Sequence, residues 1–191
     1  MLILIRHAMP AFGPASPPDE WELGEEGRRG AESLRSILPR DAVLVAGAEP
    51  KMRQTLAVAG PVATDERFNE VARDEPFDGD FRARRRAYVE GIDHDGWEAR
   101  GLVAARFDAG VREHLDRTGE KTLVVATGGM VMTVWLTTLG LDDPGGFWAD
   151  LRLPDVFAVD LDGPAVGRIE SSALVQVGGF GSEEAEPGRG R

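Results

Sequence analysis

The sequence predicts an α/β fold with three layers (α/β/α), in which helices cover both faces of a mostly parallel sheet and an antiparallel hairpin ends the domain. Three observations indicate this fold class. Short apolar runs recur along the 191 residues and suit strands buried on both faces. Segments with helical periodicity separate most of these runs, which is the order typical of a parallel sheet. The last two runs flank an Asp-Gly-Pro segment at 162–164, which is typical of a hairpin.

The predicted strands are short apolar runs bounded by polar, glycine or proline residues. In chain order we expect them over 2–5, 42–46, 62–63, 122–126, 156–161 and 165–169. Between the first strand and the first helix, residues 11–18 contain three prolines and one glycine and are expected to form a loop.

The predicted helices carry apolar residues at intervals of three and four. We expect them over 27–38, 50–59, 81–89, 97–115 and 130–139. In the helix over 97–115, Leu102, Phe107, Val111 and Leu115 lie near one face and are expected to be buried. Residues 1–180 are predicted to form a single domain, followed by a disordered tail over 181–191.

The composition excludes several classes of protein. A formal net charge of −11 argues against bulk attraction to nucleic acid or to an anionic membrane. The absence of cysteine excludes disulfides, thiolate zinc sites and a cysteine nucleophile, and the three histidines lack the spacing of metal ligands. No apolar run is long enough for a membrane helix or a signal peptide. We therefore expect a cytoplasmic protein with no metal or other cofactor.

Arg6 and His7 follow directly after the first predicted strand. In an α/β sheet, ligands bind beyond the C-terminal ends of the strands, where residues 46–53 and 127–129 also fall. A neutral imidazole carries a lone pair that can attack phosphorus, and a guanidinium donates a planar fork of hydrogen bonds to phosphate oxygens. The alternative interpretation is a capped strand end with a solvated arginine and a hydrogen-bonded histidine.

Three short blocks resemble one known family. ILIRHAMP at 3–10 resembles the opening signature of the histidine phosphatase superfamily, which includes the phosphoglycerate mutases. EPKMRQTLA at 49–57 resembles the second block of that family, and RFNEV at 67–71 resembles the block that supplies an acidic proton donor. The blocks occur in the family's order, and the resemblance covers roughly residues 1–170.

The resemblance implies a role for each matching residue. His7 is the nucleophile that forms a phosphohistidine, and Arg6 clamps the phosphoryl group. Glu70 protonates the leaving oxygen and then takes a proton from the attacking water, with Glu75 as the second choice. The chemistry implied is hydrolysis of a small phosphomonoester, so the partner is a small phosphorylated or anionic substrate.

The second cation of the site is left open between two residues. The family has an arginine four residues before the threonine of the second block, and here that position is Lys51. Arg53 is the competitor. Because positions 51 and 53 do not share a helix face, only one of them is expected to reach the phosphate. Lysine keeps the charge but lacks the bidentate fork of arginine.

The second catalytic histidine of the family is missing. After the strand at 122–126 the family has Ser/Thr-His-Gly, but this chain has Thr127 followed by Gly128 and Gly129. Gly128 takes the histidine's position in one register and Thr127 in the other, and either residue is a candidate for phosphate binding. Loss of one preorganised donor typically costs roughly 10²–10³ in rate, so reduced activity is expected. His94 is a less favoured replacement donor.

Two further features are candidates for substrate binding. The segment FRARRRAY at 81–88 is able to bind a second anionic group or to form a solvated helix face. Trp21, after the proline-rich loop, is the best candidate for an aromatic side chain that faces the substrate. Three functions remain as hypotheses: a phosphatase with reduced activity, a catalytically degenerate protein that binds phosphate or another anion, and a different enzyme that uses the same pocket.

Overall fold

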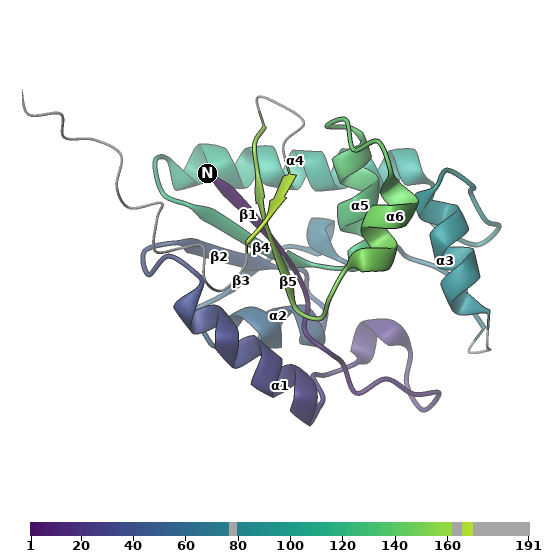
Figure 1. Cartoon of the computed structure of the whole chain (residues 1–191), viewed down its shortest axis with the longest axis horizontal. Helices are drawn as coiled ribbons and strands as arrows, with labels where there is room; N and C mark the ends of the chain where they lie inside the picture. Colours follow the sequence, from purple (N-terminus) through teal and green to yellow (C-terminus); the bar gives the residue numbers. More distant parts are fainter. Residues whose placement is uncertain (77–79, 162–165, 170–191) are drawn as a thin grey trace, which may run out of the picture.

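The computed structural model describes residues 1–76, 80–161 and 166–169 (Figure 1). The strands are β1 (Leu2–Arg6), β2 (Val43–Ala46), β3 (Ala63–Thr64), β4 (Leu123–Thr127), β5 (Asp155–Val159) and β6 (Val166–Arg168). The α-helices are α1 (Glu25–Glu32), α2 (Pro50–Leu56), α3 (Phe81–Val89), α4 (Arg100–Thr118), α5 (Gly129–Thr137) and α6 (Pro144–Asp150). Three short 3₁₀ helices occur over Pro18–Glu20, Ser33–Ser36 and Glu66–Phe68.

The six strands form one mixed sheet in the order β3-β2-β4-β1-β5-β6. The pairs β2–β3, β2–β4 and β1–β4 are parallel, whereas β5 runs antiparallel to both β1 and β6. The predicted fold class, including the antiparallel C-terminal pair, is therefore confirmed. Because β1, β2 and β4 run in the same direction, their C-terminal ends meet at one edge of the sheet.

Helices cover both faces of the sheet, as Figure 1 shows with α1 and α2 on one side and α4, α5 and α6 on the other. Alternate residues of β1 point to opposite faces. Ile3 and Ile5 pack in the cluster that includes the side chains of α2, whereas Leu2 and Leu4 pack in the cluster that includes α4 and α5. Both faces of this strand are buried, which explains why its sequence is continuously apolar.

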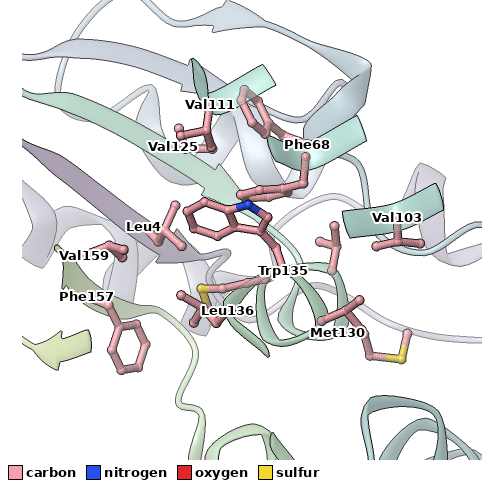
Figure 2. Packing of buried hydrophobic residues seen from close by; sticks show 14 of the residues in the cluster. Leu4, Phe68, Val103, Val111, Val125, Met130, Trp135, Leu136, Phe157 and Val159 are labelled. Atoms are coloured by element: carbon pink, nitrogen blue, oxygen red, sulfur yellow. The ribbon is translucent and has the colours of Figure 1, made fainter. Parts of the chain in front are cut away.

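Trp135 lies at the centre of the larger core cluster (Figure 2). Its ring is fully buried and packs against Phe107 of α4, with 5.0 Å between the ring centroids. Phe107 in turn packs edge-on against Phe68, which precedes the segment that carries Glu70. The core therefore holds one of the candidate site segments against the helices on this face.

Several predicted boundaries are wrong. The predicted helix over 27–38 is α1 followed by a 3₁₀ turn over Ser33–Ser36, and the predicted helix over 97–115 begins at Arg100 and ends at Thr118. The helix that starts at Pro50 ends at Leu56 rather than near 59. Leu102 was expected to be buried but is 65% exposed. It lies in the first turn of α4, and the core contacts of that helix begin at Val103.

Helix α6 was missed by the sequence analysis. The helix has only seven residues, and two of them are glycines, which weakens helical periodicity. The signal present in the sequence is Asp143 before Pro144, because the Asp143 carboxylate accepts a hydrogen bond from the Gly146 N–H and caps the helix. The predicted turn at 162–164 and the predicted tail over 181–191 lie outside the described residues, and the single domain over 1–180 stays a prediction.

Candidate functional site

Three chain segments converge where β1, β2 and β4 end. The His7 N–H donates to the Thr127 carbonyl at 3.0 Å, and the Gly47 N–H donates to the Ala126 carbonyl at the same distance. A cavity of about 1130 Å³ opens at this edge, and its lining includes Arg6, His7 and Lys51. Arg6, Lys51 and Glu70 are far apart in the sequence but line the same cavity.

His7 is held in the form that suits a nucleophile. Its Nδ1 lies 2.8 Å from the carbonyl oxygen of Ala8. Because a carbonyl only accepts, Nδ1 carries the proton and Nε2 keeps its lone pair. The hydroxyl of Thr55 accepts a hydrogen bond from the Ala8 N–H at 2.9 Å and so fixes this peptide. Burial and the charge of Lys51 lower the pKa of His7 to about 3, so the ring is neutral at pH 7.

Arg6 lines the cavity and does not use all of its hydrogen-bond donors within the described residues. Its Nη1 donates to the Leu151 carbonyl at 2.8 Å, but its buried Nε has no hydrogen-bond partner among the described residues. Burial lowers the pKa of Arg6, while the carboxylates of Glu70 and Asp155 raise it. A buried donor without a partner costs about 1–3 kcal/mol. An anion that accepts a hydrogen bond from this nitrogen would remove that penalty.

The structure separates the two candidates for the second cation. Lys51 is buried and lines the cavity, whereas Arg53 is exposed and is not among the described residues that line it. The Lys51 ammonium forms an ion pair with Glu49 and also donates to the Pro18 carbonyl at 2.6 Å. A phosphoryl group at Lys51 would therefore have to share this ammonium with Glu49.

Glu70 lies against Gly128. Its carboxylate accepts from the N–H groups of Val71 (2.9 Å), Met130 (3.1 Å) and Val131 (2.9 Å). A Cβ atom added at Gly128 would overlap the Glu70 carboxyl carbon and Oε2. The acidic side chain thus fills the space that a larger residue at 128 would need.

The contacts of Glu70 keep it ionised. Burial raises its pKa, but the charge of Arg73 and the three backbone N–H groups outweigh burial, and the pKa lies below its ordinary value. Each carboxylate oxygen faces an N–H donor, so a proton on either oxygen would weaken a hydrogen bond.

The segment that carries Glu70 is held in place by Arg106. The Arg106 guanidinium donates to the carbonyls of Arg67, Asn69 and Glu70.

Other predicted site residues are already engaged with protein groups. The Thr127 hydroxyl donates to the Phe68 carbonyl at 2.6 Å, and Thr127 is not among the described residues that line the cavity. Glu75 lines the cavity but is paired with Arg73 and Arg85. His94 packs against Tyr88 and Trp97, with Nε2 at 2.9 Å from the Arg84 carbonyl, outside the described lining.

The two substrate-binding candidates both contribute to the lining of the cavity. Arg82 and Arg85 of α3 and Trp21 all line it. Arg85 is paired with Glu75, but Arg82 is exposed and has no ion pair with any part of the chain that the structure describes. Trp148, on α6, also lines the cavity.

Glu49 is the site residue that the sequence analysis missed. It is 6% exposed, lines the cavity, and accepts from the Glu70 N–H at 2.6 Å besides its pairing with Lys51. Burial raises the pKa of Glu49, while Lys51 lowers it, and the net shift is upward. The available signal was its position: an acidic residue directly before Pro50, just beyond the end of a buried strand.

The described residues contain no group of three or more His, Asp or Glu side chains arranged to hold a metal ion. None of the helices in this part of the chain combines the length and apolarity that a membrane span needs.

Comparisons with known proteins place the fold. No protein-family model and no curated protein matches the chain. Among solved structures, mycobacterial glucosyl-3-phosphoglycerate phosphatase with VO3 matches at TM-score 0.64 and 21% identity, over 82% of this chain and 92% of that chain. YhfR of Bacillus stearothermophilus matches at 0.66 and 18%, over 87% and 94%. A phosphoserine phosphatase mutant of Entamoeba histolytica with phosphoserine matches at 0.64 and 15%, over 91% and 98%.

Two of these neighbours are named as phosphatases, and the three identities lie between 15% and 21%. At such low identities the likeness defines the class of fold, which is the phosphoglycerate mutase-like α/β fold that the resemblance implied. This chain has that fold, with His7 and Arg6 at the C-terminal edge of the sheet.

Proposed function

We propose that this chain hydrolyses a small phosphomonoester through a phosphohistidine on His7, with reduced turnover. One observation carries the proposal: a neutral His7, with its Nε2 lone pair available, lies beside the partly unpartnered guanidinium of Arg6 in a cavity. The neighbours supply further support, because two of them are named as phosphatases of small phosphorylated compounds.

The proposed reaction has two steps. In the first, His7 Nε2 forms a bond to phosphorus while the bond between phosphorus and the leaving oxygen breaks, and that oxygen takes a proton from the Glu70 carboxyl group. In the second, water attacks the phosphohistidine and gives its proton to the Glu70 carboxylate, and phosphate departs from Nε2. Arg6 and Lys51 balance the charge of the transferred group.

Reduced turnover has two causes in this proposal. No imidazole follows β4, so one donor to the phosphoryl oxygens is missing, which costs roughly 10²–10³ in rate. Glu70 is also held as the carboxylate by backbone N–H groups, so its acid form is scarce. The first step is therefore slowest for alcohols that need a proton to leave.

A second candidate function is anion binding without turnover. The observation that favours it is that two acidic groups of the cavity are already paired: Glu49 with Lys51, and Glu70 with the N-terminus of α5. A carboxylate bound in this way takes no part in proton transfer. Arg6 and Lys51 would then bind the anion without catalysing its hydrolysis.

The test is phosphate transfer to His7. The protein is incubated with phenyl phosphate, quenched in base, digested and examined by mass spectrometry. We expect a base-stable, acid-labile phosphate on the peptide that contains His7, absent in His7→Ala and retained in the control His94→Gln. Binding of phosphate without any phosphohistidine or released phenol would favour the anion-binding function instead.

A further inference from the structure

An exposed aromatic pair forms part of the cavity wall. Phe12 and Trp21 both line the cavity, with 6.1 Å between their ring centroids and an interplanar angle of 53°. Phe12 is 62% exposed, so most of its ring surface is accessible to a ligand in the cavity. Phe81, another aromatic residue of the lining, differs because the Arg85 guanidinium lies over its ring.

The pair is held in place relative to His7. The Ala11 N–H donates to the Glu22 carbonyl at 2.8 Å, which ties the two ends of the loop together. Lys51 fastens the loop at two points, because its backbone N–H donates to the Trp21 carbonyl and its ammonium donates to the Pro18 carbonyl. The aromatic surface is therefore preorganised, which lowers the entropic cost of binding.

The chemistry of the pair selects one kind of occupant. The Trp21 indole N–H already donates to the Ser16 carbonyl at 3.0 Å, so the pair offers ring surface rather than a hydrogen bond. The cavity of about 1130 Å³ is far larger than a phosphoryl group, so the alcohol part of a substrate must lie against its walls. A third ring stacked on two tilted rings gains contact energy that a saturated group of similar size does not.

We propose that Phe12 and Trp21 form a subsite for an aromatic ring, and that the substrate is a small phosphomonoester of an aromatic alcohol. The inference rests on the proposed phosphoryl site at His7. It agrees with the ionised state of Glu70, since a phenolate leaves without the protonation that an alkoxide requires. A phenolate leaving group therefore offsets the scarcity of the acid form of Glu70.

The experiment uses phosphonates, which bind but cannot be hydrolysed, so leaving-group chemistry does not enter. Dissociation constants of methylphosphonate, cyclohexylphosphonate and phenylphosphonate are measured by calorimetry at pH 7.5. We expect phenylphosphonate to bind about 3- to 10-fold more tightly than cyclohexylphosphonate. In Phe12→Leu this ratio falls toward 1 while methylphosphonate binding is unchanged. The control Ile92→Ala, which alters an exposed apolar residue outside the described lining, keeps the ratio.

Three other results would contradict either the aromatic subsite or the phosphoryl site. Equal binding of the phenyl and cyclohexyl compounds to the unaltered chain would overturn the aromatic subsite, since apolar size alone would then explain affinity. A ratio that persists in Phe12→Leu and in Trp21→Leu would also overturn it. If no phosphonate binds, the phosphoryl site at His7 fails, and the aromatic subsite fails with it. Circular dichroism confirms that each variant is folded.

Discussion

A histidine at position 128 tests the relation between Gly128 and Glu70. In Gly128→His, the new Cβ would overlap the Glu70 carboxyl group, so that group must leave the N–H groups of Met130 and Val131. The substitution thus adds an imidazole and releases the Glu70 carboxylate at the same time. Gly128→Ala is the matched control, because its Cβ displaces Glu70 and adds no donor.

The expected magnitudes follow from the contacts that change. Hydrogen bonds to a charged group contribute about 1.5–3 kcal/mol each, and water replaces part of what the two N–H groups lose. Both variants should therefore lose about 1–3 kcal/mol in the free energy of unfolding. An added donor to the phosphoryl oxygens raises kcat by about 10²–10³. Only Gly128→His gains this factor, so the ratio of kcat between the two variants measures the contribution of the added donor.

The assay is steady-state hydrolysis of phenyl phosphate, with stability followed by urea unfolding. We expect kcat to increase in the order unaltered chain, Gly128→Ala, Gly128→His. The increase from the first to the second measures the release of Glu70. Equal kcat for the histidine and alanine variants would show that position 128 does not face the phosphoryl group. Unchanged stability in both would contradict the described hydrogen bonds of Glu70.

Three further predictions concern pH, substrate charge and the core. The pKa of His7 is about 3 in the folded chain, because burial and Lys51 disfavour the imidazolium, against about 6.5 when unfolded. The unfolded chain therefore binds more protons between these values, and stability falls by up to about 1.4 kcal/mol per unit as pH drops from 6.5 toward 3; urea unfolding should show a weaker pH dependence in His7→Gln. Arg82→Gln should weaken binding of phosphonoacetate relative to methylphosphonate by about 5-fold. The control Arg86→Gln, on the same helix but outside the described lining, should leave the ratio of the two dissociation constants unchanged. An unchanged ratio in Arg82→Gln would show that Arg82 is a solvated surface residue that does not bind the second anionic group. Trp135→Ala should lose about 3–5 kcal/mol of stability, while Leu102→Ala, at an exposed position, changes it by less than about 0.5 kcal/mol; comparable losses would contradict the described packing.

Part of the site was predictable because it depends on local pattern. Apolar runs predicted β1, β2 and β4, and parallel strands bring their C-terminal ends together. The sequence pattern therefore predicts that Arg6, His7 and residues 127–129 lie at one edge of the sheet. The choice between Lys51 and Arg53 was open in the sequence, and the side on which α2 packs decided it in favour of Lys51 as the residue in the cavity.

The sequence by itself determined which segments form buried strands, the fold class, and which polar residues follow the ends of those strands. It could do so because the period of the apolar residues is a local property of the chain. It also determined that no histidine follows β4. Only the tertiary structure decided which side chain lies against Gly128. Glu70 contacts the N-terminus of α5 across about 60 residues of chain, and Thr127 bonds to the Phe68 carbonyl over a similar separation. Such contacts follow from how whole elements pack, and no local pattern encodes them.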